Sequence, residues 1–230
     1  MQNPAPATTA PSAPGGNRIR RLSPTGDLLT AYAPPEHPDQ PRTIADFLAR
    51  PDGSLIVLEA ELTTPIANHR AEGRLTLSTV GKDGRAAVLG TRAVAFGRPA
   101  DHQALLLDRA GTIHTVGSGE LTRWPVGGAP AVVARNELFE LWTPSCVLFD
   151  SRGRLLLPDS RGLLMRLDPA TGARVVVAGP GGAHLNGATV DTSLRLANYP
   201  TLAEDGTLYL VDRGNKQIKQ LPMASVEAVP

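Results

Sequence analysis

The sequence predicts an all-β protein built from repeated four-stranded antiparallel sheets, and three observations lead to this fold class. After Gly16 the apolar runs are short and rich in Leu and β-branched residues. Asp-Gly, Gly-Gly or Pro interrupts these runs about every eight to twelve residues, which is typical of many short strands. One pattern of turn and strand then recurs four times, whereas helical periodicity is hard to find.

The first half of the repeat is a turn that ends in Gly, followed by one strand. Gly suits this place because hairpin turns of this type need a positive φ. The four copies are RPDGSLIVLEAE at Arg50, LDRAGTIHTVGSG at Leu107, FDSRGRLLLPDSRG at Phe149 and AEDGTLYLVDRGN at Ala203. The residues predicted to fill the sheet cores are Leu55, Val57, Leu106, Ile113, Leu155, Leu157, Leu208 and Leu210.

The second half of the repeat is a strand, a tight Gly turn and another strand. Its copies are RLTLSTVGKDGRAAVLG at Arg74, ELTRWPVGGAPAVVA at Glu120, LLMRLDPATGARVVVAG at Leu163 and, at the front, NRIRRLSPTGDLLTAYA at Asn17. The two halves make a four-stranded unit whose turn glycines, at positions 53, 111, 153 and 206, are 58, 42 and 53 residues apart. That spacing is close to the ~40 to 50 residues of a β-propeller blade.

The prediction is therefore a β-propeller with about four to five blades, whose strands we call a to d from the axis outwards. Residues 17–230 form the propeller, and residues 1–16, rich in Pro, Ala and Thr, form a disordered tail or linker. The N-terminal copy supplies strands c and d, whereas the last copy supplies a, b and c. Either the N-terminal strands close the ring by pairing with the blade that begins at Leu196, or the chain belongs to a larger, six-bladed propeller or is completed by another chain.

Both ends of the chain resemble a known repeat family. ANYPTLAEDGTLYLVDRGNKQIKQL, from Ala197, is similar to the NHL repeat of bacterial and teneurin-like β-propellers. The Gly-rich connection before it, with DTSLRL, and GNRIRRLSPTGDLLTAYA at the front resemble parts of the same repeat. In the blades from Ile44 to Asn136 the period persists but the motif is lost, and Glu59 stands where the last copy has Asp212. The resemblance implies a scaffold that hosts binding proteins and enzymes alike.

Composition narrows the possible partners. With 23 Lys and Arg against 22 Asp and Glu, the net charge is +1, and no basic run suggests a nucleic-acid groove. No apolar run approaches the ~20 residues needed to cross a bilayer, and the sequence begins without the features of a secretory signal, so no compartment is predicted. Cys146 is expected to be a small buried apolar side chain, and Trp124 and Trp142 to pack between blades.

Candidate ligand-binding residues fall on the end of the propeller that carries the b-to-c and d-to-a connections, which we call the loop face. Two of them share one repeat position just past strand b, where a short acceptor side chain bonds the amides of the following turn. These two are Asp159 and Asp212. The full set of candidates is Glu59, Asp159, Asn186, Asp212 and Arg213, and Glu59 is predicted to begin the loop EAELTTPIANHRAEG.

Three histidines, His37, His69 and His184, also fall on the loop face and are weak candidates for metal ligands. The family resemblance implies that such a set could act like the metal site of an NHL-type amidating lyase. Glu59, Asn186 and Asp212 are likewise the residue types of the triad in calcium-dependent lactonase propellers. Neither set shows a ligand spacing in the sequence, and histidines on loops are usually solvated.

The sequence favours a non-enzymatic β-propeller module that recognises a protein or a glycan on its loop face and needs no cofactor. The alternative is a metal-dependent enzyme, either an NHL-type lyase or a gluconolactonase-like lactone hydrolase, which would require zinc or calcium. Metal analysis of the purified chain separates the two hypotheses.

Overall fold

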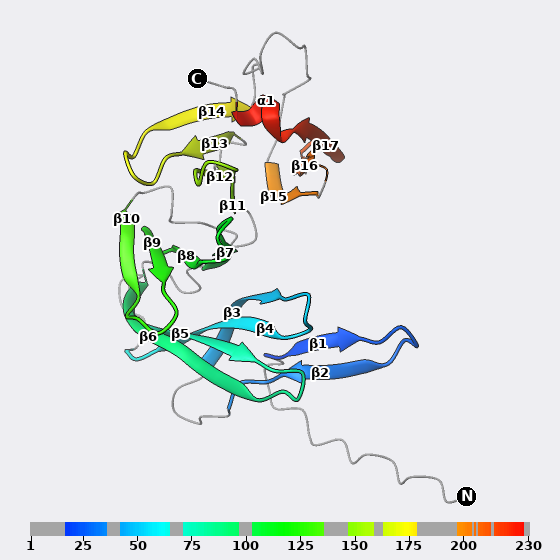
Figure 1. Cartoon of the computed structure of the whole chain (residues 1–230), viewed down its shortest axis with the longest axis vertical. Helices are drawn as coiled ribbons and strands as arrows, with labels where there is room; N and C mark the ends of the chain where they lie inside the picture. Colours follow the sequence, from blue (N-terminus) through cyan, green and yellow to red (C-terminus); the bar gives the residue numbers. More distant parts are fainter. Residues whose placement is uncertain are drawn as a thin grey trace, which may run out of the picture.

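The computed structural model is almost entirely β-structure, with successive antiparallel sheets arranged along an arc (Figure 1). It describes residues 17–35, 42–64, 71–96, 103–135, 147–158, 163–178, 197–203, 205, 207–212 and 214–227. The predicted tail, residues 1–16, and the residues Trp142 and Cys146 lie outside these ranges.

Four blades follow an N-terminal hairpin. The hairpin consists of β1 (Ile19–Leu22) and β2 (Leu28–Tyr32). Blade 1 contains β3 (Arg42–Ala49), β4 (Leu55–Leu62), β5 (Ala71–Val80) and β6 (Ala86–Phe96). Blade 2 contains β7 (Ala104–Leu107), β8 (Ile113–Gly117), β9 (Glu120–Trp124) and β10 (Ala131–Arg135). Blade 3 contains β11 (Leu148–Phe149), β12 (Leu155–Pro158), β13 (Leu164–Leu167) and β14 (Arg174–Ala178). Blade 4 contains β15 (Ala197–Leu202), β16 (Thr207–Asp212) and β17 (Gln217–Pro222), followed by the helix α1 (Met223–Glu227).

The strand order within each blade is that of a β-propeller. Every blade is antiparallel and pairs its strands in sequence order, so the first strand lies at one edge. These first strands contact one another from blade to blade, β3 against β7 and β7 against β11, and therefore form the innermost layer. The predicted fold class, an all-β propeller with four-stranded blades, is confirmed by this arrangement.

Glycine turns connect strands a and b as the repeat predicts. In blade 1 the Arg50 amide donates to the Ser54 carbonyl at 2.9 Å, and the Arg50 carbonyl accepts the Gly53 amide at 2.9 Å. Gly53 adopts φ +79°, and the matching turns of blades 2 and 3 repeat this geometry. We call the end of the propeller that carries these a-to-b turns and the c-to-d turns the turn face.

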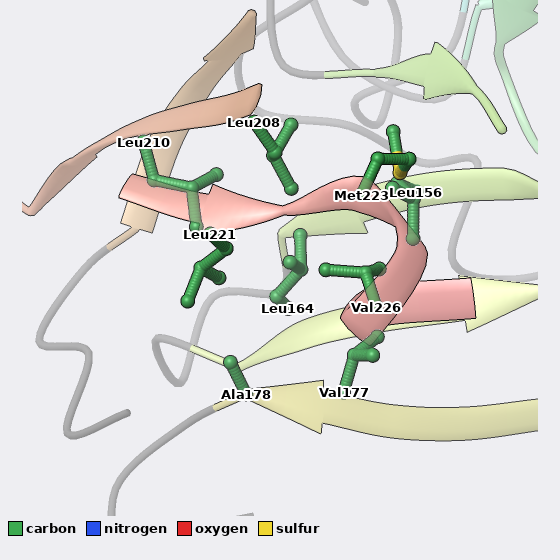
Figure 2. Packing of buried hydrophobic residues seen from close by; sticks show 9 residues of the cluster. All are labelled: Leu156, Leu164, Val177, Ala178, Leu208, Leu210, Leu221, Met223 and Val226. Atoms are coloured by element: carbon green, nitrogen blue, oxygen red, sulfur yellow. The ribbon is translucent and has the colours of Figure 1, made fainter. Parts of the chain in front are cut away.

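The core consists of layers between neighbouring blades, because each blade packs on both of its faces. Leu156 of β12 faces blade 4, whereas its neighbours Leu155 and Leu157 face blade 2. Figure 2 shows the layer between blades 3 and 4, in which Met223 and Val226 of α1 complete the packing. Seven of the eight predicted core residues are buried, and Leu55 is half-buried against the N-terminal hairpin.

The sequence prediction did not anticipate that the central strands would be buried on both faces. Ile56, Val57 and Leu58 of β4 are all fully buried, since Ile56 and Leu58 face blade 2 while Val57 faces the N-terminal hairpin. Trp124 packs between blades 1 and 2, as predicted, and its Nε1 donates to Thr115 Oγ1 at 2.9 Å.

Ring closure through the N-terminal strands, one of the two arrangements considered, is wrong for this structure. Within the part of the chain that the structure describes, β1 pairs only with β2, and the hairpin packs on blade 1 through Ile19 and Tyr32. Asn17 adds two hydrogen bonds to β3, donating to the Arg42 carbonyl at 2.5 Å and accepting the Ile44 amide at 2.9 Å. Blade 4 lies at the other end of the arc (Figure 1), and β17 pairs only with β16 among the described strands.

None of the described helical structure has the length and apolar character needed to cross a lipid bilayer.

Candidate functional site

Glu59 joins the N-terminal hairpin to blade 1. The prediction that it begins a loop is wrong, because β4 continues to Leu62 and keeps Glu59 within the strand. Glu59 is 2% exposed, and its carboxylate accepts the Tyr32 hydroxyl at 2.8 Å and lies 3.9 Å from the Arg42 guanidinium. Burial raises the pKa of Tyr32 above its ordinary value, and the hydrogen bond to Glu59 adds to the shift. These contacts give Glu59 a structural role.

Asp212 ends β16 and is fully buried. One carboxylate oxygen accepts the Asn215 amide at 3.2 Å and the other accepts Asn215 Nδ2 at 2.7 Å, so Asp212 organises the b-to-c turn. This is the role that its repeat position predicts.

The structure does not bring Glu59 and Asp212 together, since β4 and β16 lie at opposite ends of the arc (Figure 1). The other candidates, His37, His69, Asp159, Asn186, His184 and Arg213, lie outside the described residues. Within the described ranges, no group of three or more His, Cys, Asp or Glu side chains is placed to hold a metal ion.

One groove lies on the loop face between blades 1 and 2 and has a volume of about 540 Å³. Four consecutive residues of β6, Arg92 to Ala95, form one side. The other side comes from the b-to-c turn of blade 2 and the end of β10. The complete lining is Thr63, Glu72, Gly73, Arg92, Ala93, Val94, Ala95, Ser118, Glu120 and Arg135.

Glu120 is the central charge of this loop-face groove. Its two carboxylate oxygens accept hydrogen bonds from Arg92 and from Arg135, which come from different blades. Arg92 also donates to Thr122 Oγ1 at 2.9 Å and is 18% exposed, whereas Arg135 is 70% exposed. The groove therefore presents a fixed ionic network with one guanidinium open to a ligand.

A second groove lies on the turn face and has a volume of about 790 Å³. It extends across blade 2 from Arg50 in the a-to-b turn of blade 1 to Pro169 in the c-to-d turn of blade 3. Its walls include Trp124, Phe149 and Arg123.

His114 and Asp108 form a hydrogen-bonded pair in this turn-face groove. Asp108 Oδ2 lies 3.1 Å from His114 Nε2, while Oδ1 accepts the Ala110 and Thr112 amides at 2.9 and 2.8 Å. Burial lowers the pKa of His114 and outweighs the opposing effect of Asp108. Burial also acts to raise the pKa of Asp108, but the hydrogen bonds from Thr112 and His114 together hold it below its ordinary value.

These features make the His114 ring neutral at pH 7, with its proton on Nε2 facing the ionised Asp108. Nδ1 is then an acceptor, and it is buried without a hydrogen-bond partner among the described ranges of the chain. Phe149 packs edge-on against the ring with centroids 5.0 Å apart.

Sequence reasoning missed both grooves. His114 did carry a signal, since it follows Gly111 by three residues, the place that Ile56, Leu156 and Tyr209 occupy after their own turn glycines. A histidine at a core position that the other copies fill with an apolar or aromatic residue departs from the repeat, and such departures are expected at functional or strained sites. Arg92 and Arg135 carry no comparable signal, because their pairing with Glu120 depends on how two blades stack.

The strand order and blade packing define a β-propeller. No family model matches the chain, and no curated protein sequence matches it significantly. Among solved structures, the chain is similar to a catalytically inactive virginiamycin B lyase from Staphylococcus aureus with quinupristin, with 12% identity and a TM-score of 0.46 over 90% of this chain and 63% of that one. It is also similar to YCF48 bound to D1 peptide, with 17% identity and a TM-score of 0.40 over 90% of this chain and 60% of that one. The chain thus spans less than two thirds of the length of either structure.

Proposed function

We propose that the protein is a non-enzymatic β-propeller module that recognises a protein ligand through its loop face. The observation that carries the proposal is the loop-face groove beside β6. Four consecutive residues of one strand line it, and since alternate side chains point to opposite faces of a sheet, backbone as well as side chains must border the groove.

β6 offers this backbone to a ligand because it pairs only with β5 among the described strands. An extended peptide can add to such an edge through main-chain hydrogen bonds, and the flanking side chains then select its sequence. Arg135 is mostly exposed and supplies a charged contact at the rim. A peptide chain satisfies an open strand edge, whereas a glycan has no matching ladder of donors and acceptors, so we favour a protein ligand.

We further propose that the repeat is of the NHL type. The turn that Asp212 makes with Asn215 supports this assignment, because the NHL-like segment VDRGN supplies both residues. The front copy keeps the matching Asn17, which bonds to β3.

We also propose that further strands complete the arc, supplied by missing blades or by another chain. The free edges of β1 and β17 among the described strands support this. The molar mass in solution, measured by light scattering, identifies self-association.

The test of ligand recognition is selection from a displayed library of random peptides on the immobilised full chain. We expect enriched peptides that bind the wild-type protein, and we expect Ala93→Trp to weaken their binding at least about tenfold by filling the groove. Ala87→Trp is the matched control, because Ala87 is exposed on the same strand but does not line the groove.

Equal binding by wild-type protein and Ala93→Trp would contradict the site, and a library without enriched peptides would contradict the function. Elemental analysis of the same preparation tests the metal-dependent alternative, which stoichiometric zinc or calcium would favour.

A further inference from the structure

The turn-face groove contains a buried polar group at a position that the neighbouring blades fill with an aliphatic side chain. His114 is 7% exposed and occupies the repeat position of Ile56 and Leu156, both fully buried. Its Nδ1 accepts no hydrogen bond from any described residue, and a buried polar atom without a partner costs free energy. The position could have held another aliphatic residue, so the histidine calls for an explanation other than core packing.

Among the described residues, the lining of the groove carries more positive than negative charge. Arg50 and Arg123 both line it, and neither lies within ion-pair distance of a described carboxylate. Asp108, the one lining carboxylate, already accepts from His114 and from backbone amides. The groove therefore has two guanidinium groups available for an anionic ligand.

The walls between these charges are apolar. Trp124 is the last residue of β9, Pro125 and Val126 begin the c-to-d turn of blade 2, and Phe149 and Pro169 come from blade 3. Val126 is 92% exposed, which leaves a large apolar side chain in water at the rim. Such a mixture suits a ligand that alternates carboxylate groups with apolar groups.

We propose that the turn-face groove is a second binding surface, which takes an extended acidic peptide through Arg50, Arg123 and the His114–Asp108 pair. Peptide carboxylates would pair with the two arginines, and apolar peptide side chains would cover Pro125 and Val126. The His114–Asp108 pair lines the same groove and gives it a polar wall beside Arg123. This surface is independent of the loop-face groove, which lies at the other end of blade 2.

The test uses the full chain and a fluorescein-labelled decapeptide in which Asp and Glu alternate with Leu and Phe. We expect a saturable rise in fluorescence anisotropy with the acidic peptide, and none with the same peptide carrying Asn and Gln. Arg123→Glu should weaken binding at least about tenfold, because a charge-assisted contact becomes repulsive. Arg123 is exposed, so the variant is expected to fold, and its melting transition checks this.

Arg20→Glu is the matched control, since Arg20 is an exposed arginine on β1 outside the groove and the change in net charge is the same. Its binding should equal that of the wild-type protein. Equal losses in Arg123→Glu and Arg20→Glu would show long-range attraction without a site and would overturn the proposal, as would equal binding of the acidic and amide peptides. Ala93→Trp should bind the acidic peptide normally, which separates this surface from the loop-face function.

Discussion

Blades 3 and 4 follow the same repeat but bury it differently. In blade 3, Leu155, Leu156 and Leu157 are all buried, because β12 has a neighbouring blade on each side. In blade 4, Leu208 and Leu210 are buried against blade 3, whereas Tyr209 between them is only half-buried. Tyr209 stands at the repeat position of Leu156, but no blade among the described residues follows it to pack against. The repeat determines to which face of the sheet each side chain points. Whether that side chain is buried depends on the presence of a neighbouring blade.

The largest expected effect comes from removing Leu156, which fills the layer between the two blades shown in Figure 2. Leu156→Ala should lower the free energy of unfolding by about 2 to 5 kcal/mol, through lost burial and the cavity left behind. Tyr209→Ala, at the matching position of blade 4, should cost less than half as much because its side chain faces the open end. Urea denaturation of both variants measures the difference.

Equal losses in the two variants would contradict the comparison, since they would mean that something covers the open face of blade 4 in solution. A molar mass above that of the monomer would then identify a second chain as the cover.

Sequence reasoning succeeded where local chemistry decides the structure. Gly53, Gly111 and Gly153 have the positive φ that their turns need, and the spacing of these turns predicted the blade period. The turn formed by Asp212 was predicted for the same reason, because its partners lie within three residues. Contacts of this kind depend little on the rest of the fold.

The failures concern contacts between residues far apart in the sequence. Glu59 is predicted to begin a loop, yet Glu59 and Glu61 both lie in β4 and face Arg42. The Glu120 network joins side chains 28 residues apart, and no local pattern encodes that distance. Ring closure likewise depends on which sheet edges pair with each other, and the strand pattern of the sequence does not determine this pairing.

A smaller effect tests the other end of the arc, where the hairpin is held by few contacts. Asn17→Ala should destabilise the chain by about 1 to 2 kcal/mol, because it removes two hydrogen bonds and leaves the Ile44 amide without its acceptor. Asn17→Asp keeps that acceptor and should lose less. Thermal melting monitors stability, and hydrogen exchange at Ile44 shows where it is lost.

If the Ile44 amide were protected from hydrogen exchange equally in Asn17→Ala and in the wild-type protein, the hairpin would be held to blade 1 without this contact. In that case Tyr32 and the apolar layer alone would join the hairpin to blade 1.

The smallest expected effect is a pH dependence in blade 2, where the repeat position of Leu156 and Tyr209 holds His114. Burial lowers the pKa of His114 in the folded chain below its ordinary value of 6.5. As the pH falls below 6.5, the unfolded chain therefore binds a proton that the folded chain does not, and stability decreases until the folded pKa is reached. Asp108 does not contribute between pH 7 and 5, since its own pKa is lowered from 3.8.

His114→Leu, which restores the aliphatic side chain of the neighbouring blades, should lose less stability than the wild-type protein over this range. The four other histidines are common to both proteins, so the difference between their urea denaturation curves at pH 7 and pH 5 isolates His114. Identical losses would show that His114 titrates in the folded chain as it does in water, which would require the ring to be solvated and would remove the buried acceptor from the turn-face groove.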